Sequence, residues 1–154
     1  MTKISLLSAA LAIGMVAPVM AATTDPEVII YRFPGVRDNG GAINTGVATT
    51  FHCTNFSGAQ ETIRFVTRSL AGDLLSNSFS HVEHLATVAA STHFTNAYTE
   101  TANLGTGEVD GTTAIAATSI NIICTAATID ASATLPTGVA LRGIRFNPIP
   151  GSQE

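Results

Sequence analysis

Residues 48–54 read Ala-Thr-Thr-Phe-His-Cys-Thr, and residues 120–126 read Ile-Asn-Ile-Ile-Cys-Thr-Ala. Both segments are rich in β-branched and aromatic residues, which favours β-strands. Side chains two positions apart lie on one face of a strand, so Phe51 points with Cys53, and Cys124 points with the isoleucine two positions before it. Each cysteine therefore belongs to an apolar face, and we expect a bridge between two packed sheets.

The two cysteines are the only ones in the chain. In an oxidising compartment an even pair is most simply a disulfide, here Cys53–Cys124. Closing a loop of about seventy residues would stabilise the fold by about 4 kcal/mol. The competing interpretation is two free thiols or two thiolate ligands, but the chain has no Cys-x-x-Cys.

The chain begins with the three-part pattern of a secretory signal peptide. Lys3 precedes an apolar run, and small residues follow at Ala21 and Ala22. The run is short for a membrane span, which needs about 20 apolar residues. We therefore expect a signal peptide at residues 1–21 and one mature domain at residues 22–154, in the periplasm or secreted, with no transmembrane segment after cleavage.

Turn signals recur at short intervals, and the segments between them have strand character. This spacing predicts an all-β, single-domain antiparallel sandwich of about seven or eight strands. Residues 96–112 and 126–138 lack a clear period, so we interpret them as loops or edge segments. The expected strands are Val28–Phe33, Ala48–Phe56, Thr62–Ser69, Leu74–Glu83, Ala86–Thr95, Thr113–Thr125 and Val139–Phe146.

Alternation within these strands predicts which side chains are buried. In the third strand, Ile63 and Phe65 alternate with Arg64 and Arg68, which indicates one buried and one solvent-exposed face. In the last strand the alternation breaks, and a bulge at Gly143 would restore it. Arg142 and Arg145 would then point outward, and four apolar side chains would point inward: Val139, Leu141, Ile144 and Phe146.

A pair of cysteines in two strands of a sandwich resembles the immunoglobulin domain. That family also has a core tryptophan and a tyrosine two residues before the second cysteine. This chain has no tryptophan, and Ile122 occupies the tyrosine position. We therefore predict the immunoglobulin-like architecture and not membership of the family.

Charge narrows the classes of partner. The formal charge is −4, and loss of Lys3, the only lysine, would leave six arginines against eleven acidic residues, or −5. A chain this acidic, without a basic run, lacks the electrostatic footprint of a nucleic-acid binder. A mature chain without lysine also has no Schiff-base former. A protein or a surface polymer remains as the expected partner.

Residues 80–94, Ser-His-Val-Glu-His-Leu-Ala-Thr-Val-Ala-Ala-Ser-Thr-His-Phe, hold three of the four histidines. On a strand, His81 and His84 would point to opposite faces, and His93 would lie about 40 Å from His81 unless the chain folds back. In a helical turn, the spacing of His81 and His84 would make a two-ligand clip, which His52 could complete. A weak transition-metal site at His81, His84 and His52 is therefore the alternative function.

The sequence contains no recognisable catalytic grouping or cofactor motif. There is no Gly-x-Ser-x-Gly elbow. The glycine-rich segment from Gly105 to Gly111 lacks the spacing of either phosphate-binding fingerprint, so we interpret it as a hairpin or loop tip. Glu108 with Asp110, or Asp38 with Asn39, could ligate calcium, but neither loop approaches a dedicated calcium motif. We predict no enzyme activity and no cofactor.

Two further segments have specific alternatives. Val28–Phe33 is apolar on both faces, which favours a strand covered within the sandwich over one donated to a neighbouring subunit. Asn55-Phe56-Ser57 has the form of an N-glycosylation acceptor, which applies only in a eukaryotic host. The sequence as a whole predicts an exported, disulfide-stabilised β-sandwich that acts as a non-catalytic binding or structural module.

Overall fold

The computed structural model describes residues 27–146, and this range forms ten β-strands and no helix. The predicted signal peptide lies outside the described residues. Within the described range no helix is long and apolar enough to span a bilayer. The strands are β1 (Val28–Asp38), β2 (Val47–Asn55), β3 (Glu61–Ser69), β4 (Leu74–Val82), β5 (Thr87–Ser91), β6 (Ala102–Asn103), β7 (Val109–Ala117), β8 (Ile122–Asp130), β9 (Gly138–Leu141) and β10 (Ile144–Arg145).

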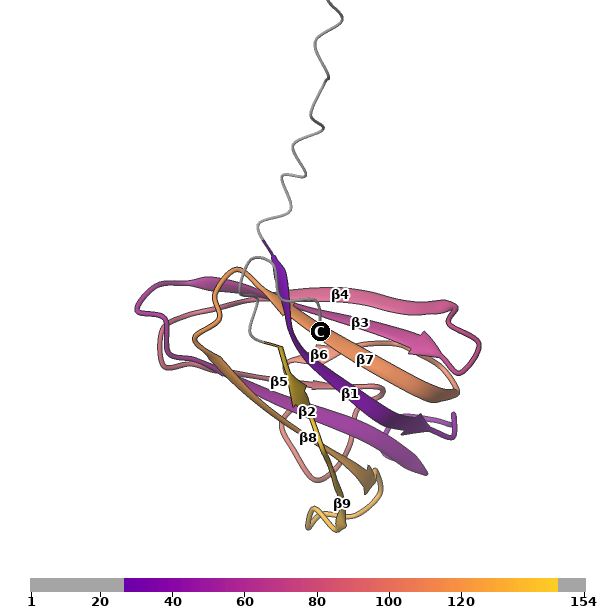
Figure 1. Cartoon of the computed structure of the whole chain (residues 1–154). Coiled ribbons are helices and arrows are strands. Elements are labelled where there is room, and N and C mark those ends of the chain that lie inside the picture. The colour runs from indigo at the N-terminus through magenta and orange to yellow at the C-terminus, as the bar shows by residue number, and fades with distance from the viewer. Residues whose placement is uncertain (1–26, 147–154) are drawn as a thin grey trace, which may run out of the picture.

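The strands form two five-stranded sheets packed face to face, which confirms the predicted all-β sandwich (Figure 1). Sheet A has the order β10-β1-β7-β3-β4, and sheet B has the order β6-β5-β2-β8-β9. All pairs are antiparallel except the short pairing of β5 with β6. β1 pairs with β7 and β10 of its own chain, as expected for a strand within the sandwich. The expectation that both of its faces are covered was wrong, because Val28 and Ile29 are each 38% exposed and Arg32 is exposed as well.

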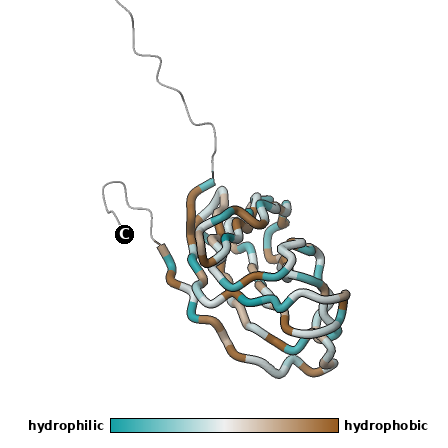
Figure 2. Tube along the Cα trace, turned by 90° about the vertical axis from the view of Figure 1, so that its right-hand side faces the viewer, coloured by the Kyte–Doolittle hydropathy of each residue, from teal (hydrophilic) through white to brown (hydrophobic). Residues whose placement is uncertain are grey.

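The core between the sheets centres on three phenylalanine rings. Phe51 of sheet B contacts Phe33 and Phe65 of sheet A, with ring centroids 5.7 and 5.9 Å apart. The predicted alternation of β3 is confirmed, because Phe65 is buried, whereas Arg64 and Arg68 point away from the core. The alternation of apolar and polar residues along the chain can be followed in Figure 2.

Cys53 in β2 and Cys124 in β8 form the predicted disulfide. The bond joins neighbouring strands of sheet B, where the two residues are direct cross-strand partners with Cα atoms 4.1 Å apart. The expectation of a bridge between the sheets was therefore wrong. Strand parity tells which face a side chain occupies, but it does not tell which strand lies beside it. A buried disulfide is typical of proteins from an oxidising environment.

Two predicted boundaries were wrong around β7 and β8. The expected strand Thr113–Thr125 is in fact two strands, β7 and β8, which belong to different sheets. β7 begins at Val109 and β8 ends at Asp130, so each strand extends into a segment that we expected to be a loop. β7 is the central strand of sheet A, and its Ala114 and Ala116 are buried on the outer face, at 6% and 8% exposure. Small residues suit such positions, but they do not alternate with polar residues. The sequence of β7 therefore lacks the two-residue pattern by which a strand is recognised.

The chain changes sheets at Gly143, between β9 in sheet B and β10 in sheet A. A side chain at this position would collide with the ring of Phe33, so the backbone crosses directly against the core. Of the four apolar side chains expected to point inward, Leu141 packs against the core, whereas Val139 and Ile144 are 71% and 55% exposed. In place of the expected bulge, the chain crosses from one sheet to the other. A bulge and a crossing both interrupt the alternation of side chains, so the local sequence does not distinguish them.

Candidate functional site

The outer face of sheet A carries most of the arginines. Arg32 of β1 lies opposite Ala114 of β7. On the other side of β7, Arg64 of β3 lies opposite Ala116, and Arg68 follows on the same face. We call this surface the arginine face and define it by Arg32, Arg64, Arg68, Ala114, Ala116, Phe79 and Phe146.

Arg64 is held in place by its neighbours. Its guanidinium forms a two-point ion pair with Glu27, in which Nη2 donates to Oε1 at 3.0 Å and Nε donates to Oε2. Nη1 donates to Oδ1 of Asn77 at 3.2 Å, and the guanidinium carbon lies 5.4 Å from the centre of the Phe79 ring. Arg64 is therefore a fixed and largely neutralised part of the arginine face.

Arg32 and Arg68 are exposed and form no ion pair with any residue of the range 27–146. The guanidinium carbon of Arg32 lies 5.7 Å from the centre of the Phe146 ring, and Nη1 of Arg68 donates to the carbonyl of Gly72 at 2.9 Å. A guanidinium has five N–H donors, so most donors of both arginines have no acceptor among the described residues. Both side chains can therefore bind an anion.

The arginine face is a region of positive charge on an acidic chain. Four of the six arginines lie on the outer face of sheet A, with Arg37 as the fourth, opposite Asp110. Arg64 forms an ion pair with Glu27, and Arg37 lies opposite Asp110, whereas Arg32 and Arg68 form no ion pair within residues 27–146. The low floor at Ala114 and Ala116 lies between Arg32 on β1 and the two arginines of β3.

The structure places the three candidate metal ligands in different parts of the fold. His81 lies at the end of β4, with Nδ1 3.1 Å from Oγ1 of Thr62. His84 lies in the turn after β4, and its Nδ1 accepts a hydrogen bond from the Gly58 N–H at 3.0 Å. His52 lies in β2 of sheet B. Residues 27–146 contain no group of three His, Cys, Asp or Glu side chains that could hold a metal ion.

The connection that contains His84 joins the two sheets. β4 ends at Val82 in sheet A, and β5 begins at Thr87 in sheet B. Leu85 has a φ of 65° in the turn between them. The stretch is therefore neither a helical turn nor a hairpin, because the strands before and after the turn pair with different partners.

His93, which sequence reasoning left outside the metal site, has close polar partners on both ring nitrogens. Nδ1 lies 2.6 Å from Oδ2 of Asp38, and Nε2 lies 2.9 Å from the carbonyl oxygen of Thr45. Oδ1 of Asp38 accepts from the Gly40 N–H at 2.7 Å. These contacts hold the β1–β2 loop against the segment after β5, and they leave neither nitrogen open to a substrate. Asp38 shares the inner face of β1 with Val36, but the sequence did not indicate this burial, because the expected strand ended at Phe33.

Residues 105–108 of the glycine-rich segment form a loop, as expected, whereas residues 109–111 belong to β7 and not to a loop tip. Gly105 and Gly107 have φ angles of 58° and 64°, in the left-handed region that glycine tolerates. Glu108 and Asp110 belong to no metal-holding group within the described range.

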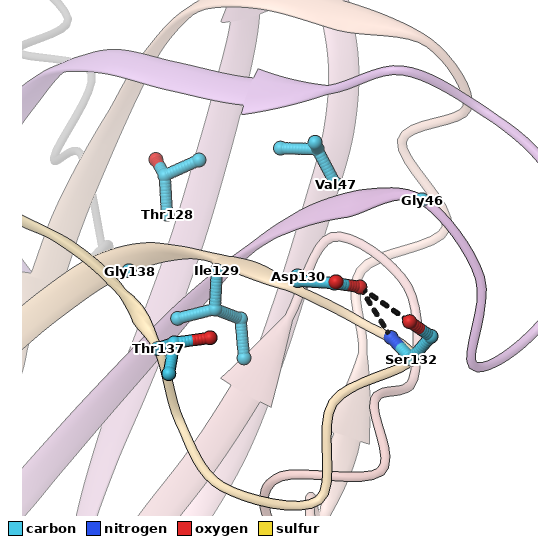
Figure 3. Close-up of a pocket in the computed structure, with 8 residues that line it drawn as sticks. All are labelled: Gly46, Val47, Thr128, Ile129, Asp130, Ser132, Thr137 and Gly138. Carbon is cyan, nitrogen blue, oxygen red and sulfur yellow. Dashed lines mark hydrogen bonds between the residues drawn. The ribbon is translucent and has the colours of Figure 1, made fainter.

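A hollow of about 490 Å³ lies beside the end of β8 (Figure 3). The amide and hydroxyl of Ser132 both donate to Oδ1 of Asp130, at 2.9 and 2.6 Å. The hydroxyl and then the amide lower the pKa of Asp130. A carboxylate with a lowered pKa is a weak base, so this pair is poorly suited to activate a nucleophile. The other residues that line the hollow are Gly46, Val47, Thr128, Ile129, Thr137 and Gly138.

Asn55 is buried and not presented to solvent. Its amide nitrogen donates to the carbonyls of Ala59 and Val82, at 2.7 and 2.8 Å. The side chain is therefore unavailable for glycosylation in the folded protein.

Comparison with known proteins identifies no relative: the chain matches no protein family, no curated protein and no solved structure.

Burial of His52 predicts a pH dependence of stability. The ring lies edge-on to Tyr98 at 4.5 Å, and burial lowers its pKa below the ordinary 6.5, with a smaller opposing effect of Glu100. As the pH falls below about 6.5, the unfolded chain takes up a proton that folded His52 resists, so the free energy of unfolding falls. We expect a smaller loss in His52→Gln between about pH 7 and pH 5, measured by urea unfolding. Parallel pH profiles for the two proteins would contradict this prediction.

Proposed function

We propose that the protein is an exported, non-catalytic binding module that holds an acidic polysaccharide on its arginine face. The observation that carries the proposal is the pair of exposed cations, Arg32 and Arg68, which have no acidic partner within the described range. They lie on strands on opposite sides of β7, across a floor of small side chains.

The chemistry of the arginine face suits carboxylates on sugar rings. A guanidinium offers parallel N–H groups that match the two oxygens of a carboxylate. Phe146 beside Arg32 and Phe79 beside Arg64 add apolar rings, on which the C–H face of a sugar can pack. A sheet surface with cations on both sides of its central strand fits an extended chain better than a compact molecule.

The overall charge favours a polysaccharide over a nucleic acid. Nucleic acids carry a phosphate every 3.4 Å or so along each strand, and binding them depends on many basic contacts. The formal charge of −4 would oppose such a dense polyanion outside the arginine face. A polysaccharide with one carboxylate per sugar has a lower charge density and needs fewer arginines.

The location outside the cytoplasm is part of the proposal. The N-terminal segment around Lys3 has the pattern of a signal peptide. The buried disulfide between Cys53 and Cys124 is suited to an oxidising compartment. A periplasmic or secreted protein would meet acidic polysaccharides at the cell surface.

Combined replacement of Arg32 and Arg68 by alanine is expected to weaken binding of polygalacturonate oligomers about tenfold, because each substitution removes a charged hydrogen-bond donor. Isothermal titration calorimetry at low salt measures the change. The matched control is Arg142→Ala, which removes an exposed arginine in the connection between β9 and β10 and should leave binding unchanged.

Three other ligands separate the possible outcomes. Neutral dextran should not bind, because it offers no carboxylate. Single-stranded DNA and vesicles with anionic lipid should bind more weakly than polygalacturonate. Equal or stronger binding of DNA or vesicles, or no binding of polygalacturonate, would contradict the proposal.

A further inference from the structure

The described part of the chain has four edge strands, and one of them is much longer than the others. Sheet A ends in β10 and β4, and sheet B ends in β6 and β9. β10 and β6 have two residues each and β9 has four, whereas β4 has nine. Short edge strands prevent unwanted pairing, so β4 is the exception in this fold.

β4 also lacks most of the other features that protect an edge, although its pairing with β3 has one irregularity, between Leu74 and Ser76. Its sequence, Leu-Leu-Ser-Asn-Ser-Phe-Ser-His-Val, contains no proline and no acidic or basic residue other than His81. Within residues 27–146, the backbone hydrogen bonds of residues 74–81 are made to β3 alone, apart from the Ser69 turn around Asp73. The outer edge of β4 therefore presents unpaired N–H and C=O groups over most of its length.

The surroundings of β4 leave this edge accessible. A hollow of about 490 Å³ separates its end from β5 and is lined by Ser80, Val82, Thr87 and Val88 among others. On the outer face, Phe79 is 55% exposed. The inward side chain of Ser76 is buried and donates to the carbonyl of Leu104 at 2.6 Å, but no backbone group of residues 27–146 pairs with the outer edge of residues 74–81.

We propose that β4 pairs antiparallel with β4 of a second copy of this chain, about a two-fold axis at Ser78. In this register Ser78 lies opposite its own equivalent, and Ser76 lies opposite Ser80, so serines face serines on the inner side. On the outer side Asn77 lies opposite Phe79. The strand carries no formal charge when His81 is neutral, so no like charges meet across the axis.

The second copy fits this edge because the pattern of β4 is symmetric about Ser78. Serines alternate with larger residues on both sides of this position. Pairing along one strand gives a small interface, so the dimer should be weak, with a dissociation constant of roughly 1 to 100 µM. The two sheets A would join into one sheet of ten strands. If the proposed function is correct, their arginine faces would then form one continuous surface.

Sedimentation velocity of the purified protein tests the pairing, at concentrations from about 1 to 200 µM. The native protein should shift from monomer to dimer over this range. Ser80→Lys should stay monomeric, because an inward charge on an edge strand opposes pairing. The variant should still fold, because position 80 is half-buried beside the hollow and the lysine can reach solvent. The matched control, Thr125→Lys, adds the same charge on exposed β8 and should dimerise like the native protein.

A second variant tests the register and does not depend on the folding of Ser80→Lys. Ser78→Cys should form a disulfide-linked dimer under mild oxidation, because the two thiols would meet at the axis, whereas Thr125→Cys should not. A native protein that remains monomeric at all concentrations overturns the proposal. The open edge of β4 would then pair only with a strand of a different protein. A dimer that Ser80→Lys leaves intact, or a Ser78→Cys protein that does not cross-link, also overturns it. None of these results depends on polysaccharide binding.

Discussion

Replacing Cys53 and Cys124 together by alanine is expected to lower the free energy of unfolding by about 4 kcal/mol. The disulfide joins residues 71 positions apart, so it removes a large part of the freedom of the unfolded chain. Both side chains are buried, at 0% and 7% exposure, and loss of the sulfur atoms also leaves a small gap in the core. Domains of this size are stable by about 5 to 15 kcal/mol, so the variant should be close to the limit of folding.

Urea unfolding followed by circular dichroism measures this loss in the free energy of unfolding. The native protein is measured both with and without a reducing agent for comparison. Reduction should reproduce most of the effect of the double substitution. Thr125→Ala is the control, because Thr125 is exposed and adjacent to Cys124, and its loss should change stability by less than about 0.5 kcal/mol. A double variant within about 1 kcal/mol of the native protein would show that the cross-link contributes little.

Replacing Asn55 by alanine should lower the free energy of unfolding by about 3 kcal/mol. Its amide group donates to the carbonyls of Ala59 and Val82, and its Oδ1 accepts from the Ser57 N–H at 2.8 Å. Alanine would leave these backbone groups without partners where the side chain is fully buried. The backbone of Asn55 also accepts from the Leu85 N–H at 2.7 Å, so the damage should reach the turn between the two sheets.

Asn121→Ala is the matched control, because Asn121 is exposed and its side chain makes no hydrogen bond within the described range. Urea unfolding should separate the two variants clearly. If Asn55→Ala is as mild as Asn121→Ala, the Asn55 network does not stabilise the connection between the sheets. Faster amide exchange at Leu85 in Asn55→Ala would locate the damage in the turn.

The strands that sequence reasoning identified well are those with two-residue alternation. The expected strands Ala48–Phe56, Thr62–Ser69 and Leu74–Glu83 agree with β2, β3 and β4 to within one residue at each end. β7 was half missed, because Ala114 and Ala116 are small residues buried on the outer face. A central strand of this composition lacks the contrast between apolar and polar positions on which the prediction depends.

The arginine face required the strand order of sheet A. Arg64 and Arg68 were correctly expected on the solvent-exposed face of β3. The sequence did not indicate that Arg32 lies across the same surface, because β1 and β3 are far apart in the chain and β7 lies between them. The contact between Asp38 and His93 was hidden for the same reason, since 55 positions separate the two residues.

The amino-acid sequence by itself determined the all-β class, the inner faces of β2 and β3, and the pairing of the only two cysteines. The tertiary structure decided which strands are neighbours, that the disulfide lies within sheet B, that the chain changes sheets at Gly143, and that β4 is an open edge. The physical reason is that alternation along a strand records which face each side chain takes. The identity of the neighbouring strand depends on long-range hydrogen bonding and packing, which local patterns do not contain.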